Sequence, residues 1–285
     1  MEDLTGRVAA VTGTASGIGK ATAVLLAEEG CCCAISDIQE EGLRRTEGEI
    51  RSLGVPVQAT ILDVADREAV YAWADDVVRE FGKANIIVNN AGVALSTSIK
   101  DMTYEDLEWL LNINLFGMIY GTKAFLPHLK RAEAGHIVNV SSVCGFIASP
   151  TQSAYTMAKF AIKGFTECLR LELEIENCGV SATVVHPGGV RTNIAREARI
   201  SESLLEETGI AAEEMSRNFD RMAISTPEKA AAKIVEGIKK NKHRVLIGPD
   251  AYLFDILQRL CPTFYLKTIS AYARLANRIL EKKST

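Results

Sequence analysis

A tyrosine and a lysine stand four residues apart, at Tyr155 and Lys159. On a helix, residues i and i+4 share one face, so the phenol and the ammonium would be neighbours. Ser142 lies thirteen residues before Tyr155 (155 − 142 = 13) and follows the apolar run Ile137–Val140, which places its hydroxyl at the carboxyl edge of a sheet. A phenol has an ordinary pKa of about 10, so it is a poor base at neutral pH unless positive charge stabilises the phenolate. Together the three side chains could move a proton to or from an alcohol oxygen, with Tyr155 as general acid or base and Ser142 orienting the oxygen. An incidental pair on a helix surface is the alternative interpretation of Tyr155 and Lys159 alone.

A glycine-rich turn near the N-terminus predicts a phosphate site. Thr12-Gly13-Thr14-Ala15-Ser16-Gly17-Ile18-Gly19 follows the apolar run Val8–Val11 and leads into helix-forming sequence. Glycines let the backbone approach a phosphate closely, and a helix N-terminus offers free N–H groups. A tight turn without a ligand is the alternative interpretation of the three glycines alone. Asp37, twenty positions after Gly17 (37 − 17 = 20), favours a dinucleotide because its carboxylate can accept hydrogen bonds from the ribose hydroxyls.

The same carboxylate favours NAD over NADP. Asp37 would repel a 2′-phosphate, and its neighbours Ser36 and Ile38 supply no cation. Arg44 and Arg45 lie one or two turns into the next helix, and we interpret them as surface charges; phosphate contact is the alternative.

Short β-branched runs alternate with longer segments of helical periodicity. Strands are predicted at Val8–Val11, Cys31–Ile35, Val57–Leu62, Ile86–Val88, Ile137–Val140, Ala182–Val185 and Val245–Ile247, and helices at Ile18–Glu29, Glu40–Leu53, Asp66–Phe81, Tyr104–Arg131, Tyr155–Asn177 and Pro227–Lys240. This alternation predicts an α/β Rossmann fold, a doubly wound seven-stranded parallel sheet with helices on both faces. We expect one dinucleotide-binding and catalytic domain over 1–250, with a helical substrate lid at 191–225, and an amphipathic helical extension over 251–285.

The composition of the chain limits which binding partners and which cellular compartment we expect. The 285 residues are 47% hydrophobic and 24% charged, with 32 Lys and Arg against 36 Asp and Glu, a net charge of −4, so nucleic acid is not an expected partner. The seven cysteines show no zinc spacing and no disulfide framework, so we expect no metal site and reduced thiols. The acidic start leaves no room for a secretory signal, and no stretch is apolar enough to span a membrane. These features predict a cytoplasmic protein.

From Leu4 to Gly248 the chain resembles the short-chain dehydrogenase/reductase family of nicotinamide oxidoreductases. The matching motifs are Thr12-Gly13-x3-Gly17-x-Gly19, Asp63-Val64, Asn89-Asn90-Ala91-Gly92, Asn114, Ser142, Tyr155-x3-Lys159 and Pro187-Gly188-x3-Thr192. The resemblance implies a catalytic tetrad of Asn114, Ser142, Tyr155 and Lys159, in which Asn114 would hold a water that exchanges protons with Lys159. It implies cofactor contacts from Gly13, Ser16, Gly17, Ile18, Gly19, Asp37, Asp63, Val64, Asn90, Ala91, Gly92, Tyr155, Lys159, Pro187, Gly188, Val190 and Thr192. It also implies a homodimer or homotetramer.

The predicted reaction is hydride transfer between NAD(H) and a neutral, fairly hydrophobic secondary alcohol or ketone. Apolar loops after two strands suggest that Leu95, Cys144 and Phe146 line the substrate side. Two alternatives remain open: an NADP-dependent reductase of ketones or 3-oxoacyl thioesters, and a non-catalytic dinucleotide sensor or peripheral membrane protein. We interpret His186 as a packed histidine and not as a base.

The last residues differ in charge from the remainder of the chain. From Ala251 onward there are six Lys or Arg and two Asp or Glu, a net charge of +4, which leaves −8 for the rest. We expect this amphipathic tail to pack over the substrate cleft or against another subunit, and docking on an anionic membrane is the alternative. Arg191, Arg196 and Arg199, in the lid, are interpreted as solvated charges, with recognition of a carboxylate or an acyl-carrier phosphate as the alternative.

Overall fold

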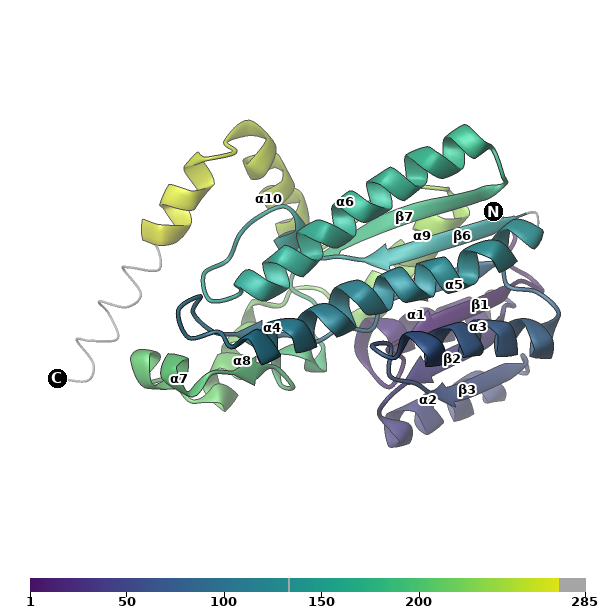
Figure 1. The fold of residues 1–285 in the computed structure, drawn as a ribbon, viewed down its shortest axis with the longest axis horizontal. Helices are drawn as coiled ribbons and strands as arrows, with labels where there is room; N and C mark the ends of the chain where they lie inside the picture. The colour runs from purple at the N-terminus through teal and green to yellow at the C-terminus, as the bar shows by residue number, and fades with distance from the viewer. Residues whose placement is uncertain (133, 272–285) are drawn as a thin grey trace.

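Seven parallel strands form the central sheet of the molecule (Figure 1). The computed structural model describes residues 1–132 and 134–271 of the chain. The sheet comprises β1 (Val8–Thr12), β2 (Cys32–Asp37), β3 (Val57–Ile61), β4 (Ile86–Asn89), β6 (Gly135–Val140), β7 (Val180–Pro187) and β9 (Arg244–Ile247), in the order β3-β2-β1-β4-β6-β7-β9. The strand order reverses between β1 and β4, which confirms the predicted doubly wound arrangement and creates a crevice at the carboxyl ends of these strands.

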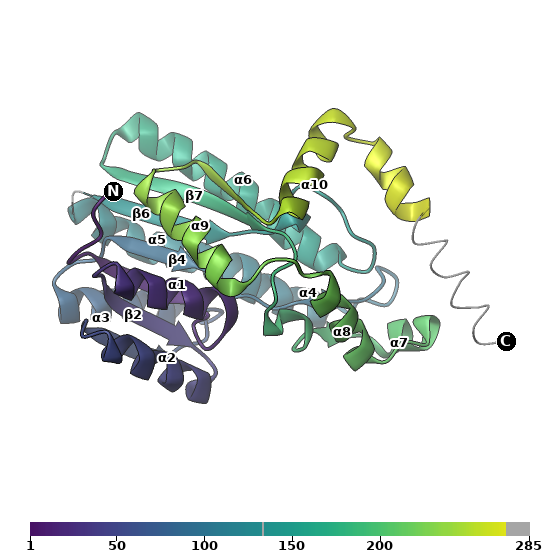
Figure 2. The same cartoon turned by 180° about the vertical axis from the view of Figure 1, so that it is seen from behind.

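Helices cover both faces of the sheet, which explains why its strands are apolar on both sides. One face carries α1 (Gly17–Glu28), α2 (Glu40–Ser52) and α9 (Pro227–Lys239), seen in front in Figure 2, and the other carries α3 (Arg67–Phe81), α5 (Gly117–Arg131) and α6 (Ser153–Glu176), seen in front in Figure 1. The Trp73 and Phe125 rings meet edge to face between α3 and α5, with their centroids 5.2 Å apart. Each layer thus buries one apolar stripe of its helices against the sheet.

The helix predicted over Tyr104–Arg131 is not continuous. It consists of α4 (Tyr104–Leu111), a π-helical segment at Asn112–Phe116, and α5. A π-helical turn inserts one extra residue without leaving a periodic signal in the sequence, and such turns often occur at functional sites. The buried Asn114 lies at its centre.

The predicted lid at 191–225 is largely helical, with α7 (Glu202–Thr208) and α8 (Ala212–Met222). The segment is not helical throughout, because it also contains a short strand. β8 (Arg199–Ile200) pairs in parallel with β5 (Leu95–Ser96), and the amide of Arg199 donates to the Ala94 carbonyl oxygen (3.0 Å). Two residues are too few to produce an alternating pattern, so this strand left no signal.

After the last strand the chain continues into α10 (Pro249–Leu260) and then into a short helix over residues 264–271. We call residues 249–271 the C-terminal arm. The predicted tail residues from Tyr272 onward lie outside the described part of the chain. In that described part, no helix is long and apolar enough to cross a membrane.

Candidate active site

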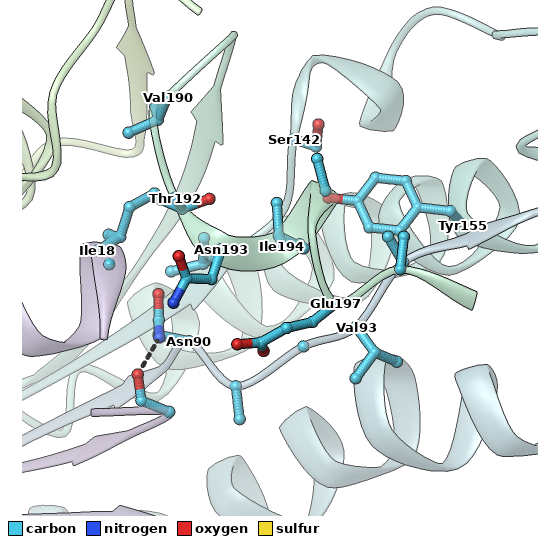
Figure 3. A pocket seen from close by; sticks show the side chains of 18 of the residues that line it. Ile18, Asn90, Val93, Ser142, Tyr155, Val190, Thr192, Asn193, Ile194 and Glu197 are labelled. Atoms are coloured by element: carbon cyan, nitrogen blue, oxygen red, sulfur yellow. Dashed lines mark hydrogen bonds between the residues drawn. The ribbon is translucent and has the colours of Figure 1, made fainter. Parts of the chain in front are cut away.

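A cavity of about 550 Å³ lies at the carboxyl edge of the sheet and gathers most of the predicted site residues (Figure 3). Those that line it are Gly13, Ser16, Gly17, Ile18, Asp37, Asp63, Val64, Asn90, Ala91, Gly92, Ser142, Cys144, Tyr155, Lys159, Pro187, Gly188, Val190 and Thr192. They come from the carboxyl ends of six of the seven strands and the loops that follow them, from α1 and from α6. The crevice predicted by the strand order is therefore the place where these residues meet.

Two of the three predicted substrate-lining residues lie elsewhere. Leu95 is buried in a cluster with Leu110, Ala154 and Ala158, on the far side of its short strand from the cavity lining. Phe146 packs edge-on against the His186 ring, with centroids 5.1 Å apart. Apolar type alone did not reveal which way either side chain points.

His186 itself is a packed histidine, as predicted. Its Nδ1 donates to the Ser142 carbonyl oxygen (2.8 Å), and burial lowers its pKa to about 4, so the ring is neutral near pH 7. The hydrogen bond holds the start of the loop that presents Ser142.

Ser142 and Tyr155 bring their hydroxyl groups together inside the cavity (Figure 3). Ser142 lies two residues beyond the end of β6, and its Oγ accepts from the amide of Cys144 (3.1 Å). The Ser141 hydroxyl donates to the Lys159 carbonyl oxygen (2.7 Å), which fastens this loop to α6. Gly145 permits the approach, since a Cβ there would lie 2.3 Å from Ser141 Oγ. The loop and the helix are thus fixed in a geometry that keeps both hydroxyls facing one point.

Lys159 lies one helical turn beyond Tyr155 and is 4% exposed. Its Nζ is 5.4 Å from the centre of the Tyr155 ring and donates to the Val140 carbonyl oxygen (3.0 Å). Burial lowers the pKa of this ammonium to about 8. The ammonium therefore sits in a poorly solvated position beside the Tyr155 ring.

The groups around Tyr155 do not lower the pKa of its phenol, although a base that works at neutral pH requires a lowered pKa. Burial raises the pKa of the phenol above its ordinary value, Cys144 adds to this effect, and the Ser142 hydroxyl opposes it in part. Removal of the phenol from water outweighs these nearby interactions. In the protein alone the phenol is consequently protonated at neutral pH.

Asn114 is buried and does not line the cavity. Its Oδ1 accepts from the Val93 amide (2.8 Å), and its Nδ2 donates to the Val93 carbonyl oxygen (2.9 Å). A Cβ on Gly92 would lie 3.2 Å from Asn114 Oδ1 and 3.7 Å from Lys159 Nζ. The side chain therefore fixes the loop after β4 close to the lysine.

The glycine loop has the geometry of a phosphate cradle. Gly13 and Gly17 have left-handed backbones, with φ of 72° and 59°. A Cβ on Gly13 would lie 2.8 Å from Ala91 Cα, and one on Gly19 would lie 2.0 Å from the Gly13 carbonyl oxygen, so Gly19 supports the loop from behind the cavity. Asn90 Nδ2 donates to the carbonyl oxygens of Thr12 (3.0 Å) and Gly13 (3.1 Å).

Within the described residues, no side chain caps the first turn of α1, because Ser16 makes no side-chain hydrogen bond there. The amides of this turn face the cavity end of the helix and suit an anionic group. These residues fit the diphosphate of a dinucleotide. In the same part of the chain, no group of three or more His, Cys, Asp or Glu side chains could hold a metal ion.

Glu197 is a site residue that sequence reasoning missed. It reaches from the lid to Gln39 at the end of β2, whose Nε2 donates to Glu197 Oε2 (3.2 Å), and both side chains line the cavity. Asp37 stands beside them and accepts from the amides of Ala15 (2.8 Å) and Gln39 (2.9 Å). Gln39 and Glu197 are 158 positions apart, so no local pattern could have paired them.

The arginines that the sequence offered as phosphate or carboxylate ligands are engaged elsewhere. Arg44 pairs with Glu47 (3.0 Å), and Arg45 pairs with Glu41. In the lid, Arg196 pairs with Asp220 (2.7 Å), Arg199 pairs with Asp106 (3.1 Å) over the Trp109 ring, and Arg191 donates to the Ala223 carbonyl oxygen (3.1 Å). None of the five is among the cavity residues, which confirms their interpretation as surface charges.

The lid closes the substrate side with apolar side chains that were not predicted. They are Ile194, Ile200, Met215, Phe219 and Met222, opposite Val93, Ala94 and Val143. Cys144 also lines the cavity, and Gln152 is a polar exception. The reacting oxygen of a substrate would thus meet hydroxyls while its carbon skeleton meets an apolar wall.

Comparison with known proteins gives consistent matches. The family model "short chain dehydrogenase" matches residues 7–203. A Mycobacterium tuberculosis protein named "Putative oxidoreductase SadH" is 42% identical over 272 residues, which cover 95% of this chain and 96% of the relative. "C alpha-dehydrogenase" of Sphingobium sp. is 32% identical, covering 88% of this chain and 83% of the relative. A crystal structure of a short-chain dehydrogenase/reductase from Burkholderia phymatum in complex with NAD superposes with a TM-score of 0.84 at 28% identity, covering 91% of this chain and 95% of that one.

Proposed function

Because the chain belongs to the short-chain dehydrogenase family and is an oxidoreductase of that family, we propose that it transfers a hydride between NAD(H) and a neutral, fairly hydrophobic secondary alcohol or ketone. The observation that carries this proposal is the meeting of the Ser142 and Tyr155 hydroxyls in the cavity, with the buried ammonium of Lys159 one turn away. The related C alpha-dehydrogenase, whose name describes a dehydrogenase, supports the same reaction class.

The residues that line the cavity divide into those that would hold the cofactor and those that would transfer the proton. The amides at Ser16–Gly19 would bind the diphosphate, Asp37 the ribose, and Asp63 and Val64 the adenine. Ala91 and Gly92 after β4, and Pro187, Gly188, Val190 and Thr192 after β7, would line the nicotinamide side. The nicotinamide, when bound, supplies the hydride acceptor or donor and, in its oxidised form, a positive charge near the phenol.

Proton transfer belongs to the chain's own side chains. In alcohol oxidation, Tyr155 as phenolate would take the hydroxyl proton while the hydride leaves the carbon for the cofactor, and a ketone results. Ser142 would donate a hydrogen bond to the substrate oxygen and hold it in line. Lys159 would stabilise the phenolate, since a nearby cation favours the charged form of the phenol. In ketone reduction the same groups would work in reverse, with Tyr155 returning the proton.

Two carboxylates support NAD over NADP as the cofactor. Asp37 lies where the adenosine ribose would be held, and Glu197 is tied to the adjacent Gln39. Both would repel a 2′-phosphate. Arg44 and Arg45 are already paired with glutamates and offer it no free cation. NAD in the Burkholderia phymatum structure agrees with this proposal.

The direct test is to follow NADH formation by purified protein with a panel of secondary alcohols, against NADPH formation under the same conditions. Turnover with NAD and apolar alcohols supports the proposal. Preference for NADP would favour the alternative reductase. Dinucleotide binding without turnover across the panel would favour a sensor.

We further propose that the protein works as a homo-oligomer in the cytoplasm. Large apolar side chains are exposed on α6 and on the π-helical segment that precedes α5, its neighbour on one face of the molecule (Figure 1): Phe116, Met157, Phe160, Leu171 and Ile175. Such a patch commonly marks a protein interface. All seven cysteines are described and free, which suits a reducing compartment.

A further inference from the structure

The C-terminal arm presents an apolar stripe away from the protein body. Tyr252, Leu253, Ile256 and Leu260 are all exposed, the last two by 55% and 76%. At about 100° per residue these positions fall within a sector about 100° wide on α10. Phe264 and Leu266, in the next helical turn, are exposed as well. Exposed apolar side chains therefore occur on both helical pieces of the arm.

The opposite side of the arm is already packed on the body. Phe254, Leu257, Tyr265 and Ile269 join a cluster with Phe146 and Ile147. The Tyr265 hydroxyl accepts from the Ala148 amide (3.3 Å), and Asp255 joins the arm to Arg244 of β9 (2.7 Å). The exposed stripe is thus a second face of a docked element, and not the unused core face of a detached helix.

This packing also corrects one expectation for the tail. The arm's residues pack behind Phe146, which does not line the cavity, and none of the described arm residues lines the cavity either. In the part of the chain that the structure describes, the tail does not cover the substrate cleft.

Charge indicates what kind of surface the stripe fits. From Pro249 to the end there are six Lys or Arg and three Asp or Glu, a net charge of +3, so the preceding residues carry −7. The arm itself has two Lys or Arg and two Asp or Glu, so the positive excess belongs to the sequence that follows it, from Tyr272 onward. An anionic surface would attract this end of the molecule and repel the rest, which orients the stripe toward that surface. Two copies joined through their stripes would gain no such attraction, because the arm itself carries no net charge. Apolar side chains flanked by cations are the pattern of helices that lie in a lipid interface.

We propose that the C-terminal arm docks the protein on an anionic phospholipid surface, with Leu253, Ile256 and Leu260 entering the interface. Figures 1 and 2 place the arm and α7–α8 at the same end of the molecule. A lipid surface bound by the arm would therefore lie at the end where α8 lines the cavity through Met215, Phe219 and Met222. Apolar substrates dissolved in that surface would be close to the site, an implication that rests on the proposed function.

The test is sedimentation of the full-length protein with vesicles, which requires no turnover and so does not depend on the proposed reaction. Vesicles of phosphatidylcholine are compared with vesicles that also contain phosphatidylserine. The double variant Leu253→Glu/Ile256→Glu is compared with Ile99→Glu/Leu53→Glu, which changes the same two residue types at other exposed positions of the molecule. Circular dichroism and light scattering check that each variant keeps its fold and its oligomer size.

We expect the unmodified protein to bind the anionic vesicles, more weakly at high salt, and the arm variant to lose about tenfold or more of this binding. The control variant should bind like the unmodified protein. No binding to anionic vesicles, or equal loss in both variants, overturns the proposal. A smaller oligomer for the arm variant, without a change in vesicle binding, would assign the stripe to a second copy of the chain and would also overturn it.

Discussion

Replacement of Tyr155 by phenylalanine tests the proposed chemistry most directly. The change removes one hydroxyl and keeps the ring between Lys159 and the cavity wall. If this hydroxyl carries the proton, turnover should fall by about 10²–10⁴-fold, the usual contribution of general acid–base catalysis. At about 1.4 kcal/mol per factor of ten, the loss is about 3–5 kcal/mol of transition-state stabilisation.

The same change should have little effect on folding. The phenol is buried beside Ser142, and a neutral hydrogen bond contributes about 1 kcal/mol to stability. Part of that cost is recovered because a buried polar group is removed. The effect on turnover therefore exceeds the effect on stability by several kcal/mol, and the two are easy to separate.

The assay follows NADH absorbance with an alcohol that the unmodified protein oxidises, and it measures NADH affinity by fluorescence titration. Tyr120→Phe is the matched control, since its ring stacks with Phe116 (6.2 Å between centroids) and does not line the cavity. We expect NADH affinity to be kept by both variants and turnover to be kept only by the control. Undiminished turnover of Tyr155→Phe would refute the proton-transfer role, whatever the fold.

Three further predictions concern the cofactor and the buried lysine. Asp37→Ala should weaken NAD binding more than NADP binding, because ribose acceptors are lost while repulsion of the 2′-phosphate is relieved; equal losses in a titration of both cofactors would contradict this. Glu197→Gln keeps a hydrogen-bond partner for Gln39 but removes a negative charge. Relief of about 1 kcal/mol of solvent-screened repulsion between this charge and a 2′-phosphate should shift the NADP-to-NAD affinity ratio about fivefold toward NADP. An unchanged ratio would show that Glu197 does not contribute to cofactor specificity. Burial lowers the pKa of Lys159 from 10.5 to about 8. The buried ammonium therefore destabilises the folded state fully below about pH 8, and this destabilisation disappears as the pH rises toward 10.5, where the lysine is neutral in both states. The excess thermal midpoint of Lys159→Met over the unmodified protein should accordingly shrink from about pH 7 to about pH 10, and a constant difference would count against a charged buried lysine.

The sequence was most informative where a local period reflects burial. The strands β1, β4 and β9 appear at the predicted runs because apolar residues on both faces leave few alternatives to a covered parallel strand. The motif residues Gly13, Ser142 and Tyr155 met in the cavity because each follows a strand or begins a helix at one edge of the sheet.

Features that depend on tertiary contacts were beyond such reasoning. The π-helical turn around Asn114 leaves the apolar period almost unchanged, so one continuous helix was predicted. Leu95 and Phe146 are apolar residues in the expected loops, but their directions are set by Leu110 and His186. The link between Gln39 and Glu197 requires knowing that the lid returns over the end of β2.

The pKa values of the catalytic pair show why burial of these two groups is useful and not merely costly. Burial alone favours the neutral form of both, since it raises the pKa of Tyr155 and lowers that of Lys159. The same poor solvation strengthens their mutual attraction once both are charged, from about 1 kcal/mol for a pair 4 Å apart in water to about 4 kcal/mol at an effective dielectric constant of about 20. In water, the attraction between a phenolate and a lysine ammonium is too weak to lower the pKa of the phenol substantially. In a buried site, each positive charge placed beside the phenol lowers its pKa more strongly. On the proposed mechanism, Tyr155 therefore stays protonated in the protein alone and acts as a base only when further positive charge arrives in the cavity.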